Sequence, residues 1–158
     1  MERVKLALLK GNRFNPWHLQ AFKMLPDTEV VAFRADSEIQ KPYDGQDDGS
    51  AEFEVEPIHF DTQTGPLVLR YRNLFLSRYR GREPHLVPFY ERLSRFDLIH
   101  TWELFTDWTA QAIEAKDRFG TPLAIMVWDN IPFNMERNAA RRRLKERAAA
   151  AGDVFIVH

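Results

Sequence analysis

Short apolar runs alternate along this chain with amphipathic stretches, and this alternation limits the fold more than any other feature. Apolar runs of strand length occur at Val4–Leu9, Glu29–Phe33, Asp97–Trp102, Leu123–Trp128 and Val154–Val157. A further, partly exposed strand is expected between residues 53 and 60. Strands that alternate with helices form parallel sheets covered on both faces. The sequence therefore predicts a doubly wound α/β fold with a mostly parallel, Rossmann-like sheet.

Capping and breaking residues predict where the helices lie. Pro and Gly bound helices expected over residues 15–25, 65–81 and 86–93. The clearest helix has one apolar stripe at steps of three and four, made of Phe105, Trp108, Ala112, Ala115 and Phe119. A basic helix over residues 138–150 is expected to turn four side chains inward, namely Ala140, Leu144, Ala148 and Ala151. Residues 37–50 are expected to form a loop.

The composition predicts one domain over residues 1–158. A content of 44% hydrophobic and 28% charged residues is typical of a globular chain, and the net charge of −1 gives no global attraction to nucleic acid. The chain has no cysteine, which fits a reducing compartment, and its start is too charged for a signal peptide. We expect a cytoplasmic protein with no metal site and no cofactor, because no metal-ligand spacing and no G-x-G-x-x-G fingerprint occurs.

Polar and aromatic side chains cluster where the predicted strands end. Ligands of open α/β sheets bind beyond the carboxyl ends of the strands. The candidates for substrate binding are Gly11, Asn12, Arg13, Asn15, His100, Trp102, Trp128 and Asn130, and the candidates for catalysis are Glu103 and Asp129. A carboxylate at a strand end can act as an acid or base, or can bind a hydroxyl group.

Each candidate also has a purely structural interpretation. Gly11 and Asn15 form either a turn and a helix cap or a site that faces phosphate. Glu103 is either a partner of the helix dipole or part of the ligand cleft, and His100 is either a core histidine or a ligand contact. Asp129 is either part of a turn before Pro132 or a functional carboxylate.

The basic helix leaves two interpretations open. Its cationic residues are Arg141, Arg142, Arg143, Lys145 and Arg147. They form either a solvated face or a surface for an anionic lipid or a phosphate-bearing substrate. The sequence thus predicts at most a weak contact with an anionic membrane surface, at the inner face of the membrane.

Three segments in this order resemble one enzyme family. Phe96–Glu103 (FDLIHTWE) is similar to the D-(V/L)-(V/I)-H-x-H strand of retaining glycosyltransferases of the GT-B fold, the group-one or family-four type. Gly120–Asp129 (GTPLAIMVWD) resembles their G-(T/K)-P-(L/V)-V-x-T-V-H-D strand. The basic helix followed by Ala151–His158 (AGDVFIVH) resembles their A-D-x-I-I-x-V-S element. The similarity extends over most of the chain and is strongest from residue 96 onward.

The resemblance implies roles for individual residues. Gly11 takes the place of the loop that approaches the donor sugar, where the family has two adjacent glycines and this chain has Gly11-Asn12. His100 matches the first histidine of the fourth strand, whereas Trp102 and Trp128 stand where the family has imidazoles. Asp129 or Glu103 would then carry the polar role.

The resemblance covers only the acceptor-side half of such an enzyme. We expect the N-terminal domain of a nucleotide-sugar-dependent retaining glycosyltransferase, whose second, nucleotide-sugar domain is absent and which is inactive alone. Its expected partners are a sugar acceptor and a nucleotide-sugar donor. The alternative is a stand-alone flavodoxin-like or receiver-like binding module. A receiver needs an acidic pair after the first strand, where this chain has Asn12 and Arg13.

Overall fold

The computed structural model describes residues 3–9, 21–36, 54–59, 86–128 and 139–157. Its strands are β1 (Val4–Leu9), β2 (Thr28–Asp36), β3 (Glu54–His59), β4 (Leu98–Trp102), β5 (Leu123–Val127) and β6 (Val154–Val157). Its helices are the 3₁₀ helix η3 (Tyr90–Arg95) and the α-helices α3 (Asp107–Phe119) and α4 (Ala139–Ala151). None of the helices within these ranges is both long and apolar enough to cross a bilayer.

All six strands form one parallel sheet in the order β3-β2-β1-β4-β5-β6. This is the order of doubly wound Rossmann sheets, and it confirms the predicted fold class. The order reverses between β1 and β4, where Leu6 pairs with Leu98 and Leu9 pairs with Thr101. The carboxyl ends of β1 and β4 therefore flank the topological switch point, where ligands of such sheets bind.

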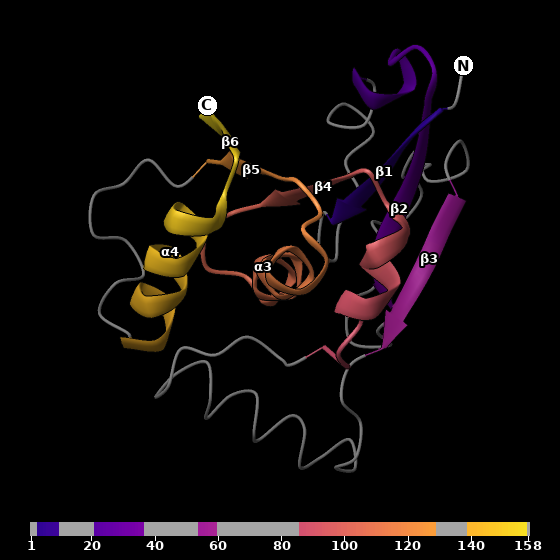
Figure 1. The fold of residues 1–158 in the computed structure, drawn as a ribbon. Helices are drawn as coiled ribbons and strands as arrows, with labels where there is room; N and C mark the ends of the chain where they lie inside the picture. Colours follow the sequence, from indigo (N-terminus) through magenta and orange to yellow (C-terminus); the bar gives the residue numbers. More distant parts are fainter. Residues whose placement is uncertain (1–2, 10–20, 37–53, 60–85, 129–138, 158) are drawn as a thin grey trace, which may run out of the picture.

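The sheet separates two apolar layers. On one face, Ala7, Leu9, Ile99 and other buried side chains pack under η3, α3 and α4, which lie on the same side of the sheet in Figure 1. On the opposite face, Leu8 and Ala32 are fully buried beneath Phe22. Alternate residues of β1 thus enter different layers, as the period of two in a strand requires.

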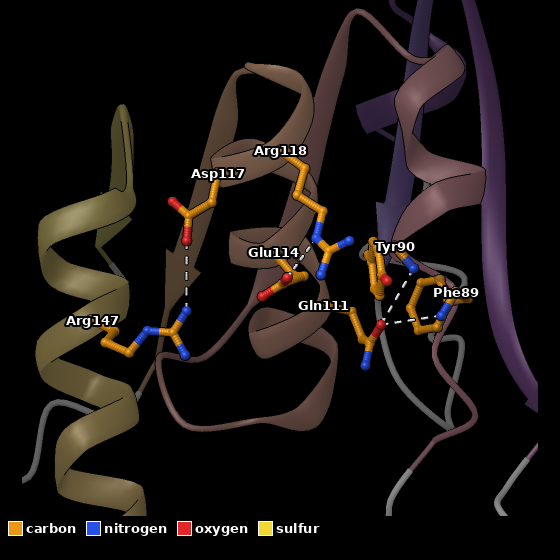
Figure 2. Close-up of polar contacts among 7 residues, drawn as sticks. All are labelled: Phe89, Tyr90, Gln111, Glu114, Asp117, Arg118 and Arg147. Atoms are coloured by element: carbon orange, nitrogen blue, oxygen red, sulfur yellow. Dashed lines mark hydrogen bonds and ion pairs between the residues drawn. The ribbon is translucent and has the colours of Figure 1, made fainter.

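Helix α3 is the central element of the larger layer. Thr106 caps its first turn by accepting the Thr109 N–H at 3.2 Å, and Gly120 ends it in the left-handed conformation at φ 74°. Gln111 accepts the backbone N–H groups of Phe89 and Tyr90 at 3.1 and 3.3 Å, which ties the segment before η3 to α3 (Figure 2).

Charged contacts link α3 to its neighbours on both sides. Arg118 donates to Glu114 at 2.7 Å and lies over the Tyr90 ring at 4.5 Å, so that its pKa is raised chiefly by the Glu114 hydrogen bond. On the side of α4, Arg147 reaches Asp117 at 3.6 Å (Figure 2). Both partners of this last pair are exposed, and such pairs contribute little to stability.

Two aspartates hold the amino edge of the sheet. Asp97, directly before β4, accepts the Lys5 N–H of β1 at 2.8 Å, and its own N–H donates to the Lys5 carbonyl at 2.9 Å. Asp153, directly before β6, accepts the Leu123 N–H of β5 at 2.8 Å and binds Lys116 of α3. The hydrogen bond from Lys116, followed by that from Leu123, lowers the pKa of Asp153.

The structure corrects several local predictions. Only the second half of the helix predicted over residues 86–93 is helical: Leu86 donates to Asp107 and Val87 donates to the His59 carbonyl, and helix η3 begins at Tyr90. Pro88 explains the shift, because a residue that precedes proline favours extended backbone.

Two apolar faces are shorter than predicted. Phe105 precedes the cap of α3, and Phe119 is 45% exposed, so the buried part of the stripe consists of Trp108, Ala112 and Ala115. Ala140 of α4 is exposed as well, and Ala148 is the buried residue of that helix.

The second strand is longer than predicted, because it pairs with β1 and β3 along both of its edges. The predicted loop at 37–50 and the helix at 65–81 lie outside the described residues.

We predict that Asp97→Ala lowers the free energy of unfolding by about 1–2 kcal/mol, because the Lys5 N–H loses its charged acceptor at the β1–β4 junction. Asp117→Ala is the matched control, since its exposed contact with Arg147 is expected to contribute less than about 0.5 kcal/mol. Guanidinium unfolding measures both variants. Equal destabilisation by the two would contradict a special role for Asp97.

Candidate functional site

The candidate site lies at the carboxyl ends of β4 and β5. Four of the predicted site residues are within the described part of the chain there: His100, Trp102, Glu103 and Trp128. The other six lie outside the described residues, namely Gly11, Asn12, Arg13, Asn15, Asp129 and Asn130. Their assignment stays a prediction from the sequence.

Glu103 joins the ends of the two strands. Its backbone N–H donates to the Met126 carbonyl at 2.8 Å. Its carboxylate oxygen Oε1 accepts a hydrogen bond from the backbone N–H of Trp128 at 3.2 Å. Its φ of 63° places the residue in the left-handed region, which is uncommon for residues other than glycine. The backbone turns sharply here, and the side chain reaches across to β5. The structure thus brings Glu103 and Trp128 together, as the sequence predicts for neighbouring strand ends.

Three threonine hydroxyls form a hydrogen-bond network next to the turn at Glu103. The Thr109 hydroxyl donates to the Glu103 carbonyl at 2.5 Å and lies 3.0 Å from the Thr106 hydroxyl and 3.2 Å from that of Thr101. Thr101 and Thr109 are fully buried. Buried hydroxyl groups are costly unless they are hydrogen-bonded, and here each one has partners. The first turn of α3 therefore fixes the backbone of Glu103 with strong local constraints.

The sequence interpretation missed this threonine network. Thr109 directly follows the buried Trp108 beside the apolar stripe of α3, and Thr101 follows the buried strand residues Ile99 and His100. A hydroxyl residue beside buried residues was the available signal, because a polar group at such a position needs a partner. The identity of that partner depends on the turn between β4 and α3, which the spacing of the residues does not determine.

His100 lies on the opposite face of β4 from Thr101. It is 4% exposed, and its ring contacts the rings of Phe22 at 5.2 Å and Trp102 at 4.4 Å between centroids. Neither ring nitrogen has a hydrogen-bond partner among the described residues. Burial is the largest influence on its pKa and lowers it to about 4. His100 is thus a neutral imidazole in an aromatic layer.

Trp102 and Trp128 give the edge its aromatic character. Trp102 is partly buried and lies 6.2 Å from Phe22 between ring centroids, whereas Trp128 is 41% exposed at the end of β5. Phe105, two residues after Glu103, lies under two cations of α4, with Arg141 at 5.5 Å and Lys145 at 5.6 Å from its ring centroid. The first turns of α4 therefore lie beside the turn that follows β4.

This arrangement can recognise a ligand but contains no complete catalytic centre within the described residues. One fixed carboxylate, an exposed indole and nearby cations could bind hydroxyl groups, an apolar ring face and negative charge. The described residues include no group of three or more histidine, aspartate or glutamate side chains suited to a metal ion.

Comparisons with known proteins leave the family of the chain open. No family model matches it, and no curated protein matches it. A similar solved structure is a Vibrio parahaemolyticus protein that is described as being of unknown function. That protein is 10% identical with a TM-score of 0.47, and the match covers 99% of this chain and 93% of the other. This likeness carries no argument about function.

We predict that Thr109→Val destabilises the fold by about 1–3 kcal/mol, because it removes the donor to Glu103 and leaves buried partners unsatisfied. Thr28→Val is the control, since the Thr28 hydroxyl makes an exposed bond to the Pro26 carbonyl. Its expected effect lies within about 0.5 kcal/mol. Guanidinium unfolding of both variants measures the difference, and equal effects would contradict the importance of the network.

We further predict that His100 makes the free energy of unfolding fall by up to about 3 kcal/mol as the pH decreases from 6.5 to 4. The unfolded chain binds a proton at His100 below pH 6.5, whereas the folded chain binds it only near pH 4, so acid favours unfolding in this window.

The variant His100→Leu should lose this part of the acid dependence in unfolding experiments at several pH values. His59→Leu serves as the control and should keep it, because His59 is exposed on β3. An unchanged acid slope in His100→Leu would show that other groups cause it.

Proposed function

We propose that this chain is the acceptor-side, N-terminal domain of a nucleotide-sugar-dependent retaining glycosyltransferase and is inactive by itself. The observation that carries the proposal is the position of the three family-like segments. They supply the three adjacent strands β4, β5 and β6. The first two segments meet just beyond their strands, where the carboxylate of Glu103 accepts the backbone N–H of Trp128. Three separate sequence similarities thus describe one continuous half of the sheet.

The sheet order supports a ligand site at this edge. A crevice opens at a switch point because the connections from the two central strands leave toward opposite faces. Here the two strands are β1 and β4, and β4 ends at Trp102, which Glu103 follows directly. The predicted substrate-binding residues Gly11 and Asn12 follow β1 in the sequence.

The chemistry of the edge suits a sugar acceptor. A carboxylate accepts hydrogen bonds from sugar hydroxyl groups, and Glu103 is held in place by its bond to the Trp128 N–H. The exposed indole of Trp128 offers an apolar surface to the carbon–hydrogen face of a sugar ring. In this proposal the edge binds and orients the acceptor. Neutralisation of the departing diphosphate, the main electrostatic requirement of the transfer, belongs to the second domain.

The observed strand order disfavours the alternative of a flavodoxin-like or receiver-like module. Those folds have the order 2-1-3-4-5, whereas this sheet has β3-β2-β1-β4-β5-β6. The observed order also occurs in dinucleotide-binding domains. Their glycine fingerprint is absent after β1, where the sequence reads Lys10-Gly11-Asn12-Arg13.

The reading frame beyond His158 provides a first test. We expect it to continue for about the length of another domain and to encode a pair of glutamates flanked by glycines. The product of that frame should release nucleoside diphosphate from UDP-glucose or GDP-mannose when hexosides are supplied as acceptors. Residues 1–158 alone should give no turnover. A stop codon after His158, or turnover by residues 1–158 alone, would overturn the proposal.

We predict that Glu103→Gln in the full-length product lowers kcat/KM for the acceptor about 10- to 100-fold, because a hydrogen bond to a charged group is lost. The glutamine keeps an oxygen for the Trp128 N–H, so the fold should survive. The KM of the donor should stay unchanged. Glu29→Gln, an exposed residue at the amino end of β2, is the matched control and should behave as wild type. Equal kinetics for the two variants would exclude Glu103 from acceptor binding.

A further inference from the structure

Positive charge is concentrated on one helix of this otherwise nearly neutral chain. Residues 141–147 of α4 contain five cationic side chains and one acidic side chain, Glu146, although the whole chain has a net charge of −1. We call the cationic residues the basic face: Arg141, Arg142, Arg143, Lys145 and Arg147.

Two cations of the basic face differ from several other cations in the described part of the chain, because they lack an ion pair there. Elsewhere, Arg92 and Arg95 both pair with Glu56, and Lys116 pairs with Asp153. By contrast, Arg142 and Arg143 are exposed, and neither has an ion pair within the described ranges. The two charges are therefore available to an external partner.

The arrangement of the basic face opposes the stability of the helix. The amino end of a helix carries partial positive charge and favours acidic residues, but the first turn of α4 has none. Arg141 and Lys145, and likewise Arg143 and Arg147, are four residues apart, where like charges repel each other. A nearby negative surface would relieve both effects. Helix α4 contacts the core through the buried Ala148 and the partly buried Leu144 and Ala151, which leaves its cations outside that contact.

The helix also lies next to exposed aromatic surface. Arg141 and Lys145 cover the Phe105 ring, which places the start of α4 beside the turn after β4. Glu103 of that turn binds the backbone of Trp128, whose side chain is 41% exposed. Clustered cations near an exposed tryptophan are typical of protein surfaces that contact the headgroup region of a membrane.

We propose that the basic face of α4 binds an anionic membrane surface through the phosphate groups of its lipids. The exposed Arg142 and Arg143 are consecutive and project about 100° apart around the helix, so they do not converge on one small anion. They can contact several headgroups spread over a plane. Charge complementarity with anionic lipids therefore favours a membrane surface over a single soluble phosphate.

Vesicle co-sedimentation of the 158-residue chain tests this proposal. The chain should bind vesicles of phosphatidylcholine and phosphatidylglycerol at 3:1 but not pure phosphatidylcholine, and 0.5 M sodium chloride should release it. The double variant Arg142→Gln/Arg143→Gln should bind roughly 30-fold more weakly, because each cation near an anionic surface contributes about 5-fold. Inorganic phosphate at 10 mM should give no saturable binding in calorimetry.

The double variant Arg3→Gln/Lys5→Gln is the matched control. It also removes two exposed charges, but from the start of β1, at the amino edge of the sheet. It should bind the mixed vesicles as wild type does. Absence of binding to the mixed vesicles, equal losses in the two double variants, or equally tight binding to a single-stranded oligonucleotide would overturn the proposal. The assay involves no sugar transfer, so its result is independent of the proposed enzymatic role.

Discussion

The ladder between β1 and β4 is the interaction on which the rest of the structure depends. These strands lie more than ninety residues apart in the sequence, since Lys5 binds Asp97 with a separation of 92. Among the described strands, β1, β2 and β3 are joined to β4, β5 and β6 through this pairing. The same ladder creates the switch point, so the contact that holds the two halves together also creates the place where a ligand can bind.

The strands other than β3 were largely predictable because each carries its own apolar run. The start of β1 and the whole of β6 agree with the sequence pattern, which depends only on local residues. The segment from Leu86 to Phe89 was not predictable in this way. Its backbone bonds go to Asp107 and Gln111 of α3, about twenty residues later in the chain, and these partners replaced the helix that local propensity favoured.

The site was predictable in its location but not in its internal construction. The rule that parallel strands end at one edge brings Glu103 and Trp128 together, and the hydrogen bond between them agrees with it. The sequence did not show that Glu103 adopts a positive φ or that Thr109 holds its carbonyl. Both features depend on the three-dimensional path of a short turn, for which the residues have no periodic pattern.

The family-like segments contain two kinds of residue with different physical roles. Asp97 and Asp153 come just before β4 and β6, and each accepts a backbone N–H near the start of a neighbouring strand at the amino edge, from Lys5 of β1 and Leu123 of β5. Glu103 and Trp128 come at the opposite, carboxyl edge, where a ligand would lie. The aspartates are therefore explained by strand pairing alone. Any function of these segments consequently depends on the residues at the carboxyl edge, because the amino-edge aspartates would serve the same purpose in a sheet that binds nothing.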